Sequence, residues 1–320
     1  MSGGFVAATV EMLRARGLEV RVVSPADFRH HGLARPPGIP ANVLHRPWRA
    51  LLVPSLLASF RRAAARAARD ADLVHAHWLG AGAVAATLGK PYVLQVHGTD
   101  LVLGRRVPWL VRPILRRAAA VAAGSGALAD DARALGAHDV RVVPTGVAIP
   151  PEVVPPEEPP HVLYVGRLSE EKGVLELAEA ARDLPLVVAG AGHLASRLPG
   201  VVGPVPPREL GRYYDRAAVV AVPSRREGYG LVAREAMAHG RPVVASAVGG
   251  LVEAIEDGVN GVLVPPRDIT ALREALEELL ADAGERKRLG TAARAHAVEH
   301  FSREAELEAL LGVYAEALSS

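Results

Sequence analysis

Residues 217–249 read AAVVAVPSRREGYGLVAREAMAHGRPVVASAVG, and this stretch shows the order of elements most clearly. The apolar runs 217–224 and 242–249 have the length and the Ala/Val content of buried strands. The segment between them has the spacing of a helix that starts near Leu231. A strand, a helix and a second apolar strand form the repeating unit of a parallel sheet that is covered on both faces. We therefore predict a doubly wound α/β domain here, which binds its ligand at the carboxyl ends of the strands.

Apolar, β-branched runs alternate with helical segments along the whole chain. We expect strands at 19–24, 72–77, 91–98, 119–125, 140–146, 161–166, 184–190, 201–205, 217–224, 242–249 and 261–266. The proline-rich segment PPEVVPPEEPP, 150–160, suits neither a helix nor a central strand and is interpreted as a linker. The pattern predicts two Rossmann-like domains, 1–150 and 151–302, facing across a cleft. The apolar stripe of a last helix, 303–320, must also be buried, and the first domain is one place where it can pack.

The first residues raise a question about the first domain. A doubly wound domain normally opens with a buried strand before its glycine turn, whereas here Ser2-Gly3-Gly4 leads directly into a helical segment. We expect the first strand of this domain to be missing, either through a start site assigned too late or through a truncation. Either case would leave a gap in the first sheet and weaken the activity.

Composition excludes several classes of protein. None of the 320 residues is cysteine, which excludes disulfide frameworks, thiolate chemistry and cysteine-based zinc sites. The first residues do not resemble a signal peptide, and no apolar run is long enough to span a bilayer. We therefore expect a cytoplasmic protein. The net charge of +2 combines +10 for residues 1–150 with −8 for residues 151–320, so a basic half can meet an anionic surface or substrate.

Two glutamates surround the Gly-Tyr-Gly break in the opening stretch. Glu227 precedes the expected helix, and Glu235 lies about one turn inside it. Because a carboxylate can accept two hydrogen bonds from a vicinal diol, each could hold one sugar of a nucleotide-sugar. In the alternative interpretation both are surface residues, Glu227 paired with Arg225 or Arg226, and Glu235 with Arg234 or Arg241. Spacing alone does not separate the two interpretations.

A second polar cluster follows the strand expected at 161–166, in GRLSEEKG. Arg167 and Lys172 come after Gly166 and precede a helix, and Lys172 is one of only three lysines in the chain. Cations beside the free amides of a helix N-terminus suit a diphosphate. The alternative is a solvated loop in which these cations pair with Glu170 and Glu171.

Together these motifs carry a family resemblance. GRLSEEKG, followed about 55 residues later by EGYGLVAREAMAHGRPVVAS, resembles the C-terminal domain of the retaining GT-B glycosyltransferases of glycosyltransferase family 4. The glutamate pair has that family's E-x7-E spacing, and the likeness continues in VGGLVEAIEDGVNGVLVPPRD, HGTD, AGSGALADDARALG and PTGV. Thr145 in PTGV stands where the family usually has asparagine.

The resemblance implies a role for each matching residue. It implies that Arg167 and Lys172 bind the donor diphosphate, that Glu235 holds the ribose, and that Glu227 holds the hydroxyls of the donor sugar. His97, with Asp100 nearby, would reach the donor sugar from the first domain. The remaining donor-binding positions implied by the family are Gly3, Gly4, Gly166, Val205, Tyr229, Gly230, Leu231 and Val232.

The resemblance also implies a mechanism without a metal or other cofactor. The nucleoside diphosphate would leave, an oxocarbenium-like centre would form, and the acceptor hydroxyl would attack from the same face. Protein cations would stabilise the leaving diphosphate. No His, Asp or Glu grouping in the sequence has convincing metal-ligand spacing, and we interpret His75 and His77 as structural residues.

The acceptor is less clear from the sequence. In residues 101–120 the basic and aromatic side chains Arg105, Trp109, Arg112 and Arg116 share one helical side, and Val107, Leu110, Ile114 and Ala118 share the other. With the basic first half, this suggests contact with anionic lipid at the inner face of the membrane and a sugar or lipid-linked acceptor. An ordinary solvated face is the alternative, and nucleic acid is not an expected partner.

Three other functions are compatible with parts of this pattern. An NDP-sugar 2-epimerase shares the fold but needs further acid/base carboxylates. A two-domain sugar-binding protein shares the sheets but would not need the phosphate-binding cations. A truncated, catalytically weak transferase could persist as a sugar-nucleotide-binding partner subunit.

Overall fold

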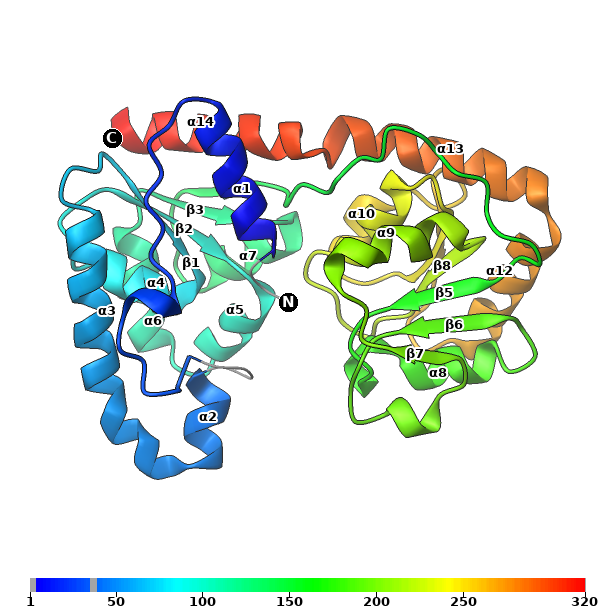
Figure 1. Cartoon of the computed structure of the whole chain (residues 1–320), viewed down its shortest axis with the longest axis horizontal. Helices are drawn as coiled ribbons and strands as arrows, with labels where there is room; N and C mark the ends of the chain where they lie inside the picture. The colour runs from blue at the N-terminus through cyan, green and yellow to red at the C-terminus, as the bar shows by residue number, and fades with distance from the viewer. Residues whose placement is uncertain (1–3, 35–38, 320) are drawn as a thin grey trace. The chain divides into compact units, whose positions relative to one another are not determined.

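The computed structural model describes residues 4–34 and 39–319, and the chain divides into two compact units (Figure 1). The six-stranded unit comprises Val143–Glu308, Gly124–Leu128 and the residues before Val10. The four-stranded unit comprises Val10–Ala123, Ala129–Val142 and Ala309–Ser320. Each unit contains one parallel sheet, so the predicted α/β fold with two parallel sheets is confirmed. The domain boundaries at 150 and 302 stay predictions.

The sheet of the six-stranded unit has the order β10-β9-β8-β5-β6-β7. Its strands are β5 Val162–Val165, β6 Leu186–Ala189, β7 Val201–Gly203, β8 Val219–Val222, β9 Val243–Ser246 and β10 Val262–Val264. β5 pairs in parallel with β8, with Val162 opposite Val219. The chain order reverses beside β5, and this is where a doubly wound sheet binds its ligand.

Helices cover both faces of this sheet. Val220 and Val222 face a core with Met237 and Leu251, whereas Val219 and Ala221 face a second core on the opposite side. The residues of both cores are almost completely buried, which explains why these strands are continuously apolar. The helices are η3 Glu170–Lys172, α8 Val174–Ala180, η4 Ala195–Arg197, α9 Pro207–Arg216, α10 Leu231–Ala238, α11 Gly250–Ala254, α12 Ile269–Ala281 and α13 Ala283–His300; α14, Arg303–Ser319, begins in this unit.

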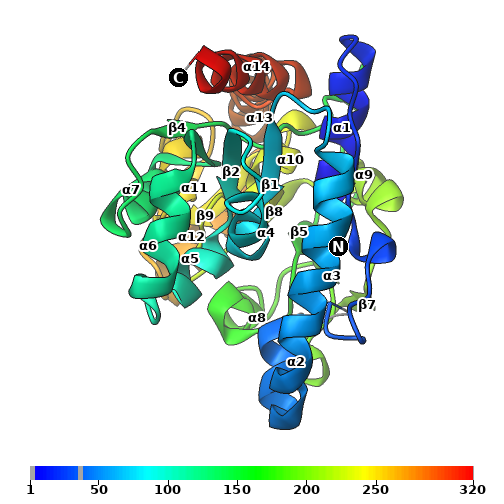
Figure 2. The same ribbon diagram turned by 90° about the vertical axis from the view of Figure 1, so that its left-hand side faces the viewer.

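The four-stranded unit has the order β1-β2-β3-β4, and all of its strand pairs are parallel. The strands are β1 Val74–His77, β2 Tyr92–Val96, β3 Ala120–Ala123 and β4 Val140–Val142. The helices are η1 Pro25–Asp27, α2 Ile39–His45, η2 Pro47–Leu52, α3 Val53–Ala67, α4 Trp78–Ala85, α5 Gly98–Gly104 and α6 Pro108–Arg117. Two further helices, α1 Gly4–Ala15 and α7 Gly126–Ala134, begin in the six-stranded unit and continue into this one. Figure 2 shows the long helix α3, with α2 near its lower end in this view.

One strand prediction is wrong. Residues 19–24 form no strand, and within the described residues β1 is the first strand of the chain. An apolar, β-branched run becomes a strand only when a neighbouring backbone completes its hydrogen bonds. Here no strand of the described chain pairs with it, and Val22 remains 48% exposed. The other ten predicted runs each contain a strand.

Candidate functional site

Two loops of the six-stranded unit meet at one edge of its sheet. Because β5 and β8 are parallel neighbours, the segments that follow them, Gly166–Gly173 and Pro223–Gly230, leave from the same edge. The first segment carries Arg167 and Lys172, and the second carries Glu227. The sheet therefore brings together residues that are 55 positions apart in the sequence.

Lys172 and Glu227 form a partly buried ion pair at this edge. Lys172 Nζ lies 2.6 Å from Glu227 Oε2, and the two side chains are only 20% and 17% exposed. The Ser224 hydroxyl donates to the same carboxylate oxygen over 3.2 Å. The ammonium still has donor capacity for an anion, and the other carboxylate oxygen can accept from a hydroxyl group.

Close backbone packing holds these loops in place. A Cβ atom on Gly173, whose φ is +66°, would lie 1.9 Å from the carbonyl oxygen of Pro223. A Cβ on Gly249, φ +48°, would lie 2.0 Å from the carbonyl oxygen of Glu227, and Gly250 N donates to that same oxygen over 3.1 Å. These contacts leave no room for side chains, which explains both glycines.

The surface interpretation of the glutamates is wrong. Arg225 pairs with Glu176 at 2.6 Å, Arg234 donates to the carbonyls of Tyr229 and Gly250, and Arg241 donates to the carbonyl of Val154. The two cations of GRLSEEKG have different surroundings. The Arg167 side chain is exposed, and its Nη2 lies 3.5 Å from Glu171 Oε2, as expected for a solvated loop. Lys172 instead pairs with Glu227.

The Gly-Tyr-Gly break leads into the N-terminus of α10, as predicted. Gly230 is the N-cap in the left-handed conformation, φ +79°, and among the described residues no side chain caps this end. The first amides of a helix lack intrahelical partners, so those around Gly230, Leu231 and Val232 are suited to an anion. The Tyr229 hydroxyl donates to the carbonyl of Thr145 over 2.5 Å.

Glu235 does not take part in the Lys172–Glu227 pair and has a hydrogen-bond donor of its own. Its Oε2 accepts a hydrogen bond of 2.7 Å from the hydroxyl of Tyr214 in α9, a fully buried residue. Burial raises the pKa of Glu235, while the tyrosine hydrogen bond acts in the opposite direction. One carboxylate oxygen remains available to a ligand hydroxyl.

The remaining predicted donor-site residues fall in three groups. Gly166 directly follows β5, and Val205 lies in the loop after β7, packed against the core. Gly4 begins α1, whereas Gly3 lies outside the described residues. Asp100 belongs to α5, and its side chain also lies outside the described part of the chain.

His97 belongs to a cluster of rings in the four-stranded unit. It follows β2, and its ring lies 4.5 Å from that of Trp78 and 5.8 Å from that of His77. The rings of His77 and His75 stack at 4.5 Å, and His75 Nδ1 shares a 2.7 Å hydrogen bond with the Tyr314 hydroxyl in α14. Burial lowers the pKa of His77 and His97 to about 4, and that of His75 well below its ordinary value.

This cluster predicts a stability that depends on pH. In the unfolded chain these histidines bind protons below a pKa of about 6.5, whereas in the folded protein His77 and His97 remain neutral down to about pH 4. Because the unfolded state binds more protons in this window, stability decreases as the pH falls from about 6.5 to about 4. Thermal unfolding followed by tryptophan fluorescence measures this, since Trp48, Trp78 and Trp109 all lie in the four-stranded unit.

Two histidine variants control that measurement. His77→Gln removes one buried titrating ring and should flatten the decrease. His138→Gln changes an exposed histidine and should leave it unaltered. A pH dependence equally steep in His77→Gln and the parent would contradict this assignment.

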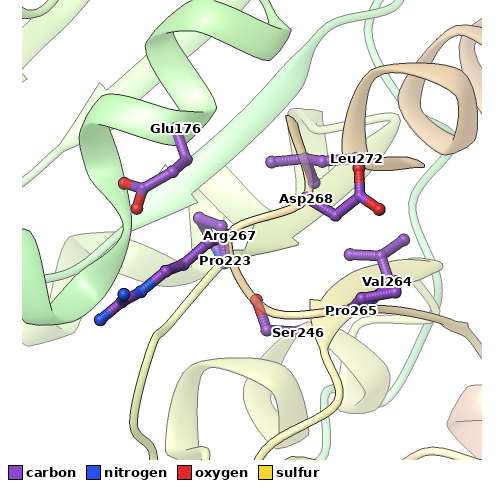
Figure 3. A pocket seen from close by; sticks show the side chains of 8 residues that line it. All are labelled: Glu176, Pro223, Ser246, Val264, Pro265, Arg267, Asp268 and Leu272. Atoms are coloured by element: carbon purple, nitrogen blue, oxygen red, sulfur yellow. The ribbon is translucent and has the colours of Figure 1, made fainter. Parts of the chain in front are cut away.

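A small hollow lies at the carboxyl ends of β8, β9 and β10. Figure 3 shows the side chains that line it: Glu176, Pro223, Ser246, Val264, Pro265, Arg267, Asp268 and Leu272. None of these was predicted as a site residue. The hollow has no room for a molecule of the size of a nucleotide-sugar.

Sequence reasoning missed the residues that support the site. Ser224 has no predicted role, and its position at the end of the buried run 217–224 is the only available signal. Tyr214 had no signal, because nothing in the sequence places α9 beside Glu235. The Gly249-Gly250 pair belongs to the family-like segment VGGLVEAIEDGVNGVLVPPRD, but its packing against Glu227 is visible only in the fold.

Both halves of the chain match known protein families. Residues 3–149 match the family described as Glycosyltransferase Family 4, and residues 148–296 match Glycosyl transferases group 1. D-inositol 3-phosphate glycosyltransferase 1 of Catenulispora acidiphila is 33% identical over 326 residues, covering 83% of this chain and 77% of that protein. This chain belongs to glycosyltransferase family 4.

Other relatives of this family 4 chain differ in how much they match. A D-inositol 3-phosphate glycosyltransferase of Xylanimonas cellulosilytica is 42% identical over 185 residues, which are 51% of this chain. The match spans 43% of that relative's length, so the chain corresponds to less than half of it.

Solved structures identify the fold of the family 4 chain as GT-B. Sucrose-phosphate synthase from Thermosynechococcus elongatus superposes with a TM-score of 0.79 at 26% identity, covering 98% of this chain and 93% of that one. HepE of Anabaena, solved in complex with UDP, superposes with a TM-score of 0.69 at 21% identity, covering 80% and 82% of the two chains.

Proposed function

We propose that this protein is a retaining glycosyltransferase that moves a hexose from a nucleoside-diphosphate sugar to a hydroxyl group of a glycan or lipid-linked acceptor. The observation that carries the proposal is the partly buried Lys172–Glu227 pair beside the uncapped N-terminus of α10. An ammonium and free helix amides suit a diphosphate, and a carboxylate suits the sugar next to it. Membership in glycosyltransferase family 4 supports the same chemistry.

Each residue of the proposed site has a physical role. Lys172, with Arg167 and the amides of α10, neutralises the charge that develops on the departing diphosphate. Glu227 is oriented by Lys172 and Ser224 and holds hydroxyls of the transferred sugar. Glu235, oriented by Tyr214, holds the ribose. The acceptor hydroxyl attacks the carbon that the diphosphate leaves, from the same face, and its proton passes to a diphosphate oxygen. His97 and Asp100 keep their predicted role at the donor sugar.

Nucleotide binding tests the proposal directly. UDP, GDP and ADP, each with its matching glucose conjugate, are compared by thermal shift, with the free nucleosides as controls. At a concentration 100 times its Kd, a ligand that binds only the folded state adds about 2.7 kcal/mol of stability. We expect a clear shift with at least one diphosphate and none with its nucleoside at the same concentration. Absence of a shift with all three would contradict the proposal, and conversion of the sugar without transfer would favour the epimerase.

We further propose that α6 contacts anionic lipid and so brings the enzyme to a lipid-linked acceptor. Trp109 is 73% exposed and Leu110 53% exposed on this helix, and Arg112 and Arg116 are exposed as well. The buried apolar residues of α6 are Val111 and Leu115, whereas the side predicted as apolar, Val107, Leu110, Ile114 and Ala118, is half-buried or exposed. An exposed tryptophan among arginines is typical of a membrane interface. No helix in the described residues is long and apolar enough to cross a bilayer.

Vesicle sedimentation measures this contact. We expect the protein to sediment with phosphatidylglycerol vesicles at low salt and to be released at high salt, because the attraction to the lipid headgroups is screened. A Trp109→Ala, Leu110→Ala double variant should lose most of the binding. Trp48→Ala is the matched control, since Trp48 is 59% exposed in η2, outside α6. Equal sedimentation with phosphatidylcholine vesicles would contradict the contact.

A further inference from the structure

Arg234 is a buried cation directly beneath the Gly-Tyr-Gly loop. It lies in the first part of α10 and is 2% exposed. Among the residues that the structure describes, no carboxylate lies within ion-pair distance of it. Burying a guanidinium without a carboxylate partner costs free energy, unless other groups take over the interactions that water would make with it. Around Arg234 these groups belong to the loops of the proposed donor site or pack against those loops.

Two aromatic rings surround the guanidinium. Its central carbon lies 3.9 Å from the centre of the Tyr229 ring and 4.5 Å from the centre of the Phe301 ring. Ring faces attract a cation, most strongly where water is excluded. Tyr229 is also fixed at its far end, because its hydroxyl donates to the carbonyl of Thr145. The buried side chain of Arg234 therefore packs against Tyr229, the middle residue of the Gly-Tyr-Gly loop, and restrains it.

The guanidinium also binds the backbone of the loop. Arg234 Nη1 donates to the carbonyl oxygen of Tyr229 and, over 3.3 Å, to that of Gly250 at the start of α11. A trans peptide is planar, and its C=O and N–H point in opposite directions. Holding the carbonyl of Tyr229 against Arg234 therefore fixes the N–H of Gly230 in the direction opposite to that carbonyl. Gly230 is the N-cap of α10, where backbone donors have no intrahelical partner.

We propose that Arg234 is a positioning residue, which aims the amide of Gly230 at the diphosphate of the donor by holding the preceding carbonyl. This inference rests on the proposed function, since it assigns a further residue to the same donor site. Arg234 itself does not touch the substrate. Its effect passes through one peptide plane, so it is specific for the phosphate part of the ligand.

An affinity ratio tests this role. NMR titration measures binding of UDP, GDP and ADP and of their nucleosides to the full chain, and the tightest diphosphate is retained as the probe. In Arg234→Met, we expect the affinity for this diphosphate to fall about tenfold, as for one lost charge-assisted hydrogen bond, with the affinity for its nucleoside unchanged. Arg234→Lys keeps the charge without the planar fork, so it should lose less.

Arg241 provides a matched control. It is also a buried arginine, 3% exposed, and it donates to a backbone carbonyl, that of Val154, outside the loop. Arg241→Met should lower thermal stability without changing the ratio of diphosphate to nucleoside affinity. If Arg234→Met does not fold, Phe301→Leu removes one of the two rings and leaves the loop residues intact, and a smaller loss of the same ratio is expected.

The outcomes separate the two proposals. If the parent chain binds none of the three diphosphates, the proposed function and the role of Arg234 both fall. If the parent binds a diphosphate but the ratio is unchanged in the folded Arg234 variants and in Phe301→Leu, the positioning role alone is wrong. A ratio reduced in the Arg234 variants but not in Arg241→Met supports the role.

Discussion

A Lys172→Met variant should bind the donor diphosphate roughly 100-fold more weakly than the parent, corresponding to about 3 kcal/mol. The change removes a cation proposed to contact the diphosphate. It also leaves Glu227, whose side chain is only 17% exposed, with the Ser224 hydroxyl as its remaining side-chain donor among the described residues. An uncompensated carboxylate beside the diphosphate repels it. Isothermal titration with the diphosphate that gives the largest thermal shift measures this loss, and transfer assays should show a matching fall in kcat/KM.

A double-mutant cycle shows whether the pair acts as a unit. Glu227→Gln removes the charge but keeps the shape, so adding Glu227→Gln to Lys172→Met should recover part of the lost affinity, with a coupling energy of about 1–2 kcal/mol. Lys287→Met is the control for loss of a lysine, because Lys287 is exposed on α13. Full affinity and full transfer rates in Lys172→Met would refute the assignment of this site.

A Gly173→Ala variant should lose about 3–5 kcal/mol of stability in the six-stranded unit. The new Cβ would lie 1.9 Å from the carbonyl oxygen of Pro223, and the residue would have to keep a φ of +66°. Backbone atoms cannot move aside as a flexible side chain can, so the two loops would separate. Since Lys172 and Ser224 are the neighbours of the colliding residues, the Lys172–Glu227 pair should be disrupted as well.

Gly258→Ala separates the clash from the backbone conformation. Gly258 has a φ of +69°, but a Cβ there would meet nothing within 4 Å, so this change should cost only about 1 kcal/mol. Urea unfolding followed by circular dichroism gives the comparison. Tryptophan fluorescence reports on the four-stranded unit alone and serves as an internal reference. Equal losses in the two alanine variants would mean that the Gly173–Pro223 contact is not as close as described.

Much of the fold could be predicted because its elements are locally encoded. The runs at 161–166, 217–224 and 242–249 are continuously apolar, and they become β5, β8 and β9, buried on both faces. The Gly-Tyr-Gly break predicted the start of α10 because glycine readily adopts the left-handed conformation that Gly230 has. The segment 19–24 shows the limit of such reasoning, because an apolar run needs a paired neighbour to form a strand.

The amino-acid sequence alone specifies which residue types follow the strands: a rare lysine after one strand, a glutamate after another, and glycines such as Gly173 at close backbone contacts. The partners of these residues follow only from the folded chain. Strand order placed β5 beside β8 and so paired Lys172 with Glu227, while Arg167 stayed with Glu171 in solvent. It also placed Arg234 between two rings instead of against Glu235. The physical reason is that hydrogen bonds and charge pairs depend on distances in space, which periodicity along the chain does not encode.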